Sequence, residues 1–249
     1  MTNYSSNNHS NSYFIFKKFI DLIFPPKCLN CDCIIESIGG FCEKCWLKID
    51  FISKPSCYIC SYPFEYNIGE HALCASCIKE KPYYEKAVSI FKYNDNSKKI
   101  IHGLKFLDKT YFAPYLGNLM HKALHPLDQD IIAPIPIHKF RLLKRFYNQS
   151  LLLAQAVSNI SGVTLVPDLL LKVKNTIPQS GLTKKQRQKN IKNAYILNPK
   201  YKDKIVGKKI LLVDDVITTG STANLCAKIL VKAEVKKVEL VTLAKTVFN

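Results

Sequence analysis

Paired acids followed by a run of small hydroxyl residues carry the clearest chemistry in this chain. Residues 210–222 read Ile-Leu-Leu-Val-Asp-Asp-Val-Ile-Thr-Thr-Gly-Ser-Thr. Asp214 and Asp215 could hold sugar hydroxyls or a magnesium ion. Gly220 lets the backbone bend where a Cβ would block an anion. The hydroxyl donors beside it suit a phosphate, and they are Thr218, Thr219, Ser221 and Thr222. The stretch predicts a site for a phosphorylated ribose.

The elements around this stretch must hold it open to a ligand. The apolar residues before the acids indicate a buried parallel strand, and the pattern after Gly220 indicates a helix that starts at Ser221 or Thr222. The N–H groups at a helix start are unpaired and lie at the positive end of the helix dipole, which favours an anion. The loop therefore sits where a phosphate is best bound.

Three other interpretations compete for the same stretch. A Walker B strand needs a G-x-x-x-x-G-K-[ST] loop elsewhere, and none of the nine glycines begins one. A receiver domain needs more chain than residues 216–249. An ordinary strand, turn and helix stays open, but it gives no reason for the Thr-Thr-Gly-Ser-Thr run.

Four C-x-x-C pairs lie between residues 28 and 77, and they indicate two metal sites. Two such pairs can close one tetrahedral site with four thiolates, which is typical of structural zinc. The expected ligands are Cys28, Cys31, Cys42, Cys45, Cys57, Cys60, Cys74 and Cys77. We expect the first pair to join the second and the third to join the fourth, although a crossed arrangement or reduced structural cysteines stay open. Cys33 is expected to be a bystander, and His71 is an alternative ligand.

Only three of the 36 basic residues are arginine, and they are Arg141, Arg145 and Arg187. The guanidinium group binds phosphate oxygens in pairs, which lysine does not do. The first two follow a strand that ends in a Pro-x-Pro loop, and their alternative is a solvated helix face. The third lies in the polar segment 179–190, which indicates a mobile loop over an anionic substrate or, alternatively, an exposed linker.

The net charge of +17 and a pI near 9.4 favour a polyanionic partner, such as nucleic acid, a membrane surface or a phosphorylated substrate, or reflect a lysine-rich composition alone. The beginning of the chain shows no secretory signal, and the apolar stretch 14–24 is short and interrupted by charges. We therefore expect a cytoplasmic protein with no transmembrane segment. The stretch 14–24 is either a helix packed on the cysteine-rich module or a peripheral membrane helix.

Beyond the cysteines, strand patterns alternate with helix patterns, which predicts a mostly parallel sheet covered on both faces. The expected strands are 86–93, 131–137, 169–173, 194–197, 209–213 and 238–244, and the expected helices are 97–106, 111–124 and 141–160. We expect a disordered tail at 1–18, the cysteine-rich module at 19–82 and an α/β domain at 83–249. Both the Asp-Asp loop and the Pro-x-Pro loop would lie at the carboxyl ends of strands, where such sheets bind ligands.

The motifs together resemble the ComF family, which is competence-associated and similar to phosphoribosyltransferases. The resemblance covers residues 19–246 and rests on the cysteine pairs and on five segments in family order: Ile101-His-Gly-Leu-Lys-Phe106, Pro134-Ile-Pro-Ile-His138, Arg145-Phe-Tyr-Asn-Gln149, Gln179-x-Gly-Leu-x4-Arg187-x2-Asn190 and Asp214-Asp-x-x-Thr-Thr-Gly220. One departure is Phe146, where the family usually has glycine. The resemblance implies an α/β fold with a type I phosphoribosyltransferase-like parallel sheet, flanked by helices, and a small N-terminal double zinc ribbon.

The same resemblance implies roles for the candidate residues. Asp214 and Asp215 would hold the ribose hydroxyls of phosphoribosyl pyrophosphate, and residues 218–222 its 5′-phosphate. Arg141, Arg145 and Arg187 would meet the pyrophosphate, with magnesium bound to the substrate and two structural zinc ions in the ribbon.

Two functions are compatible with these roles. One is an active phosphoribosyltransferase with an unknown acceptor that supports DNA uptake or nucleotide metabolism. The other is a non-catalytic accessory protein that senses a nucleotide and binds single-stranded DNA or a helicase-like competence protein.

Overall fold

The computed structural model describes residues 25–36, 40–106, 109–124, 126–174 and 193–247. The chain divides into two compact units, Met1–Lys48 and Ile49–Asn249, and each is described by itself. The first two cysteine pairs belong to the smaller unit, whereas the last two belong to the same unit as the main sheet. The expected boundaries of the cysteine-rich module, after residue 18 and after residue 82, stay predictions.

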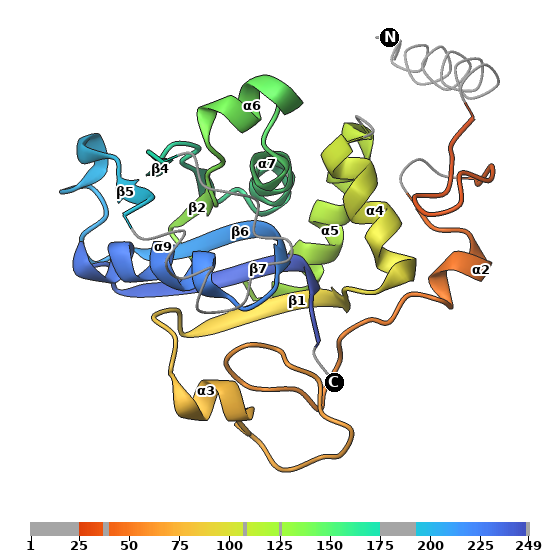
Figure 1. Ribbon diagram of the computed structural model, residues 1–249, viewed down its shortest axis with the longest axis horizontal. Coiled ribbons are helices and arrows are strands. Elements are labelled where there is room, and N and C mark those ends of the chain that lie inside the picture. Colours follow the sequence, from red (N-terminus) through yellow and green to blue (C-terminus); the bar gives the residue numbers. More distant parts are fainter. Residues whose placement is uncertain (1–24, 37–39, 107–108, 125, 175–192, 248–249) are drawn as a thin grey trace, which may run out of the picture. The chain divides into compact units, whose positions relative to one another are not determined.

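The larger unit is built on a five-stranded parallel sheet with the strand order β1-β7-β6-β2-β3 (Figure 1). Its strands are β1 (Lys86–Lys92), β2 (Ile131–Pro134), β3 (Thr164–Leu165), β6 (Lys209–Ile217) and β7 (Lys237–Lys245). Every neighbouring pair is parallel, and the register joins Val213 of β6 to Pro134 of β2 and to Val241 of β7. The predicted parallel sheet is confirmed.

Helices cover both faces of this sheet, as Figure 1 shows. The larger unit contains the helices α3 (Ala75–Lys79), α4 (Asp95–Phe106), α5 (Ala113–Leu124), α6 (Lys139–Arg145), α7 (Gln149–Ser161) and α9 (Ser221–Lys232), with short 3₁₀ turns η1 (Thr110–Phe112) and η2 (Pro199–Tyr201). α5 and α7 lie on one face and α9 on the other. A Cβ at Gly117 of α5 would come within 2.4 Å of Ala156 Cβ, so glycine allows the close packing of α5 on α7.

The core lies between the sheet and these helices. The middle of β6 is apolar on both faces because each face is covered, and Leu211, Leu212 and Val213 are fully buried there. Leu153 and Val157 of α7 and Leu230 of α9 are also fully buried. This packing fixes the carboxyl end of β6, where the acids lie.

The single helix expected over 141–160 is wrong, because two helices, α6 and α7, occupy this stretch. Phe146 ends α6 in the left-handed conformation with φ 63°, and its N–H bonds to the Leu142 carbonyl at 2.7 Å. Asn148 then caps α7 by accepting from the Ser150 N–H. The apolar spacing continues through the break, so periodicity alone could not reveal it.

The strands expected near 169–173 and 194–197 are present as β4 (Leu170–Lys172) and β5 (Tyr195–Leu197). They form an antiparallel pair in a separate two-stranded sheet.

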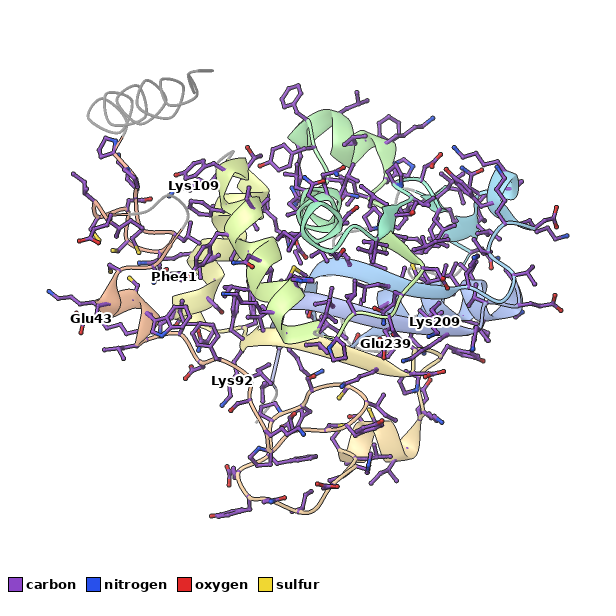
Figure 2. The ribbon with its side chains drawn as sticks, turned by 180° about the vertical axis from the view of Figure 1, so that it is seen from behind. Phe41, Glu43, Lys92, Lys109, Lys209 and Glu239 are labelled. Carbon is purple, nitrogen blue, oxygen red and sulfur yellow. The ribbon has the colours of Figure 1, made fainter. Side chains whose placement is uncertain are left out.

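At the edge where the main strands begin, charged groups pair with one another. Lys209 Nζ lies 2.8 Å from Asp128 Oδ2, and Lys237 Nζ lies 2.9 Å from Glu239 Oε1, with Lys209 and Glu239 labelled in Figure 2.

The smaller unit is described over residues 25–48 except 37–39. It contains one short helix in this range, α2 (Glu43–Trp46), and an isolated antiparallel bridge between Lys27 and Ile34. The ring centroids of Phe41 and Trp46 are 6.1 Å apart, and Figure 2 labels Phe41. With so few apolar contacts, a segment of this size depends on its cysteines for stability.

In the described parts of both units, no helix has the length and apolar character needed to cross a bilayer.

Candidate functional site

The candidate site lies at the carboxyl end of β6, beside the end of β2. From β2 the chain runs outward to β3, and from β6 it runs the other way to β7, so the strand order reverses between β2 and β6. Parallel sheets bind ligands at such a reversal, beyond the carboxyl ends of the strands. The pairing of β2 with β6 ends at Val213, and Asp214 and Asp215 come directly after it.

Asp214 is held by two hydrogen bonds to one carboxylate oxygen. The Ser150 hydroxyl, at the start of α7, donates to Asp214 Oδ1 at 2.9 Å, and the Asp215 N–H donates to the same oxygen at 2.9 Å. Burial and the neighbouring charge of Asp215 raise the pKa of Asp214 to about 7. This carboxyl group can therefore gain or lose a proton near neutral pH.

Asp215 has a different environment, because it forms an ion pair with Lys105. Lys105 Nζ, near the end of α4, lies 2.8 Å from Asp215 Oδ2. A sugar hydroxyl or a magnesium ion that binds Asp215 would compete with this lysine. Lys105 was not among the site residues predicted from the sequence, although it belongs to the segment 101–106, on which the family resemblance partly rested.

The loop between β6 and α9 has the features expected of a phosphate-binding loop. α9 begins at Ser221, as predicted, and Gly220 precedes it in the left-handed conformation with φ 72°. The Thr219 and Ser221 hydroxyls are 2.8 Å apart. α9 has no acidic residue in its first turn and no side-chain cap, so no carboxylate of its own first turn offsets the positive end of the helix dipole, which favours an anion. Thr218 and Thr222 flank these residues in the same loop.

The Pro-x-Pro loop after β2 is fixed to the start of α7. Asn148 Nδ2 donates to the Ile135 carbonyl at 3.2 Å, and the Ile135 N–H donates to the Val213 carbonyl at 2.8 Å. His138 caps α6 by accepting from the Phe140 N–H at 3.3 Å. These bonds bring the loop, α7 and β6 together at one edge of the sheet.

Arg145 reaches the same edge from the end of α6. Its Nη1 donates to Gln149 Oε1 at 3.3 Å, and its guanidinium lies 4.7 Å from the centroid of the Phe106 ring. Gln149 is only 2% exposed, and its Nε2 has no hydrogen-bond partner among the described residues. Buried donors are usually paired, so Gln149 could donate to a ligand oxygen here.

The structure does not describe the side chains of the other two predicted arginines. The backbone of Arg141 belongs to α6, but its side chain lies outside the described part of the structure. Arg187 and the whole segment 179–190 also lie outside it. Their expected contacts with pyrophosphate stay predictions.

The cysteines gather into two groups, each drawn from neighbouring pairs. In the larger unit, Cys57, Cys60, Cys74 and Cys77 are all buried and their sulfur atoms lie within 4.8 Å of one another. A hydrogen bond from the Cys60 thiol lowers the pKa of Cys57 to about 4, whereas the same hydrogen bond raises the pKa of Cys60 and burial raises that of Cys77. Four thiols so close, with no open position, fit a structural zinc ion.

The group in the smaller unit differs from the prediction in one member. Cys28, Cys31, Cys33 and Cys42 have sulfur atoms within 4.8 Å of one another, so Cys33, expected from the sequence to be a bystander, lies where it could bind a metal. Cys45 lies close by. Its thiol accepts a hydrogen bond from Asn30 Nδ2 at 3.6 Å and also forms a hydrogen bond with Cys31. Five thiols thus compete for four positions, and the C-x-x-C spacing could not show this.

Tyr84 is a further residue that sequence reasoning missed. It is buried just before β1, and its hydroxyl would lie 3.3 Å from a Cβ placed on Gly220. Burial raises the pKa of Tyr84, and the second cysteine group raises it further. No local pattern marks this tyrosine, because its neighbours are distant in the sequence.

Comparisons with known proteins agree with this geometry. The model of the double zinc ribbon domain family matches residues 19–78, and that of the phosphoribosyl transferase domain family matches residues 149–246. Competence protein F of Haemophilus influenzae is 31% identical over 230 residues, which cover 89% of this chain and 98% of that protein. The chain belongs to the ComF family.

Two further comparisons give a relative named for DNA utilization and a solved structure. DNA utilization protein YhgH of Escherichia coli is 28% identical over 214 residues, covering 83% of this chain and 91% of that protein. Among solved structures, adenine phosphoribosyltransferase from Thermoanaerobacter pseudethanolicus is 18% identical and covers 57% of this chain and 83% of that chain, with a TM-score of 0.36. The expected α/β fold with a cysteine-rich double zinc ribbon region is confirmed.

Proposed function

We propose that the site at the end of β6 binds phosphoribosyl pyrophosphate with magnesium. The observation that carries this proposal is the position of two carboxylates near the carboxyl end of β6, two residues before the glycine-containing hydroxyl segment that leads into α9, where the strand order reverses. Asp214 and Asp215 accept from the ribose hydroxyls, and the Thr218–Thr222 loop donates to the 5′-phosphate. The substrate thus spans the two carboxylates and the hydroxyl loop.

The proposed reaction is displacement of pyrophosphate from C1 of the ribose by a nitrogen nucleophile. The C1–oxygen bond to pyrophosphate breaks, the C1–nitrogen bond forms, and the transition state resembles an oxocarbenium ion. Arg145 and Gln149 stabilise the leaving pyrophosphate, with Arg141 and Arg187 as further candidates. Asp214 and Asp215 are the residues that would hold magnesium with the substrate, and the ion would offset the negative charge of the leaving pyrophosphate.

The wider role that we propose follows from the relatives, which are named as competence and DNA utilization proteins. The chain would act in the cytoplasm, where its cysteines stay reduced. Its product would serve the handling of incoming DNA or nucleotide metabolism.

Calorimetric titration with magnesium phosphoribosyl pyrophosphate tests the proposed ligand. The zinc-loaded protein should bind in the micromolar range, and Asp214→Asn/Asp215→Asn should lose at least tenfold in affinity. A matched control is Asp168→Asn, which removes a carboxylate that pairs with Lys200 and Tyr201 away from the loop. Equal binding by all three proteins, or none by the folded wild type, contradicts the proposal.

A second candidate function is binding of single-stranded DNA, and α6 is the observation that favours it. Phe140 of α6 is 59% exposed and Phe146, which directly follows the helix, is 88% exposed; α6 has the sequence Lys-Phe-Arg-Leu-Leu-Lys-Arg. Exposed aromatic rings among cations can stack on bases while the cations meet phosphates. This surface would serve a DNA-handling protein with or without turnover.

A variant without the two exposed aromatic rings distinguishes this candidate from the first, because it should lose affinity for DNA alone. Phe140→Ala/Phe146→Ala should weaken binding of an oligodeoxynucleotide severalfold without changing the salt slope, because stacking carries no charge. Affinity for phosphoribosyl pyrophosphate should be unchanged in this variant. Unaltered DNA binding would exclude α6 as the interface.

A further inference from the structure

Tyr84 lies between the second cysteine group and the loop at the start of α9. Its side chain is 5% exposed, and it belongs to the same buried cluster as Cys57, Cys60, Ile217 and Ala223. Its hydroxyl lies 3.3 Å from the position that a Cβ would take on Gly220. The residue therefore lies next to Gly220, where it would limit any larger side chain.

The backbone on either side of Tyr84 is fixed to the elements that form the site. The Tyr83 N–H donates to Asn224 Oδ1 of α9 at 2.6 Å, and the Glu85 N–H donates to the Val238 carbonyl of β7 at 2.9 Å. Asn224 in turn donates its N–H to the Gly220 carbonyl at 2.8 Å. The segment entering β1 thus supports the first turn of α9.

The second cysteine group is fixed to the same segment. The Ala87 N–H donates to the Ile59 carbonyl at 2.6 Å, and the Ser61 hydroxyl donates to the Ala87 carbonyl at 2.6 Å. Ile59 and Ser61 flank Cys60, so the third cysteine pair is hydrogen-bonded to the start of β1. Movement of this pair would move the start of β1, which Tyr84 precedes by two residues.

A metal would hold this pair in place. The sulfur atoms of the four buried cysteines lie within 4.8 Å of one another, which is close enough for a tetrahedral thiolate site. A zinc ion bound to all four thiolates would tie the third cysteine pair to the fourth, a restraint that the buried thiols alone do not supply. The order of the pair therefore depends on the metal.

We propose that Tyr84 is a positioning residue that links occupancy of the second zinc site to the conformation of the Thr218–Thr222 loop. With zinc bound, the third cysteine pair holds Tyr84 against Gly220 and the loop keeps its ligand-binding shape. When zinc leaves, Tyr84 is released and the loop loosens. The inference rests on the proposed phosphate-binding role of the loop, but the coupling itself needs no ligand.

Hydrogen exchange of the loop amides, measured without any ligand, tests this coupling. Loss of the second zinc ion through Cys74→Ser/Cys77→Ser should speed exchange at residues 218–222 at least tenfold, while amides in the middle of β6 and β7 stay protected. The matched control, Cys28→Ser/Cys31→Ser, removes zinc from the other compact unit and should leave the loop unchanged. Unchanged loop exchange in the first variant, with a protected core, overturns the proposal.

Tyr84→Phe and Tyr84→Ala separate positioning from a merely structural role. Both should retain two zinc ions, and in Tyr84→Ala the loop should exchange fast whether or not the second site is loaded. Tyr84→Phe should restore most of the protection, since the ring remains. If zinc removal still speeds loop exchange tenfold in Tyr84→Ala, the coupling does not pass through this residue.

Ligand titration then shows which proposal has failed, if either has. Zinc at the second site should tighten binding of magnesium phosphoribosyl pyrophosphate about tenfold in the wild type and not in Tyr84→Ala. If the wild type binds no such ligand yet its loop exchange follows zinc occupancy, the proposed function fails and the coupling stands. If it binds equally well with and without the second zinc ion, the coupling fails alone.

Discussion

Two adjacent carboxylates with opposite environments define the site at the scale of single residues. Asp214 is held by Ser150 and its own backbone, and its pKa is raised to about 7, whereas Asp215 pairs with Lys105. Such a division lets one acid change protonation near neutral pH while its neighbour stays paired. The sequence revealed the two acids but not their partners, because Ser150 and Lys105 come from α7 and α4.

Replacing Asp214 by asparagine should stabilise the protein at high pH. The raised pKa means that the folded state binds this proton more tightly than the unfolded chain, so stability is lost as pH rises from about 4 to about 7. The asparagine side chain would keep an oxygen for both hydrogen bonds and carry no charge. At pH 8, Asp214→Asn should raise Tm by about 5 °C, and at pH 4 by nothing.

Thermal unfolding at both pH values without magnesium checks this prediction. Asp168→Asn is the control, since it removes a carboxylate that pairs with Lys200 and should not raise Tm at either pH. A pH-independent gain in Asp214→Asn would mean that the carboxyl group is not the source.

At the scale of elements, two left-handed residues set where helices begin and end. Gly220 with φ 72° starts α9, and Phe146 with φ 63° ends α6. The first could be predicted, because glycine after hydroxyl residues marks a turn. The second could not, because phenylalanine rarely adopts this conformation, and so two helices were predicted as one.

Gly220→Ala should destabilise the protein more than Gly207→Ala. Both glycines have φ near 70°, but a Cβ at position 207 meets open space, whereas one at position 220 meets the Tyr84 hydroxyl at 3.3 Å. We expect a loss of about 1 kcal/mol for Gly207→Ala and about 2 kcal/mol for Gly220→Ala in urea unfolding. The excess should shrink in a Tyr84→Phe background, and an unchanged excess would contradict this contact.

Phe146→Gly should increase stability by about 1 kcal/mol, since glycine adopts positive φ without strain. The phenylalanine side chain is 88% exposed and gives up little packing. Phe146→Ala is the control, because alanine keeps the backbone strain and should bring no gain. If both variants gain equally in chemical unfolding, removal of the exposed ring is the cause.

At the scale of the whole molecule, the two cysteine groups belong to different compact units and differ in exposure. Cys31 and Cys33 are exposed in the smaller unit, whereas all four cysteines in the larger unit are buried. The C-x-x-C spacing predicted two groups of neighbouring pairs, and the structure has them. It could not predict that the second group would join the core of the sheet, since that depends on contacts with β1 and α9.

Zinc should therefore leave the protein in two phases under a chelator. The exposed site should lose its ion first, and the buried site should lose it at least tenfold more slowly, because the larger unit must open. A chromogenic zinc indicator records both phases, and Cys28→Ser/Cys31→Ser should abolish only the fast one. A single phase from the wild type would contradict the assignment of the two sites.

The central claim is that the acids of β6 and the loop before α9 form one phosphoribosyl site. A crystal structure of the zinc-loaded protein with magnesium phosphoribosyl pyrophosphate tests it most directly. We predict ribose hydroxyls within hydrogen-bonding distance of Asp214 and Asp215, and the 5′-phosphate on the amides of residues 218–222. Ligand density elsewhere on the protein, or an empty loop at saturating ligand, would contradict the account.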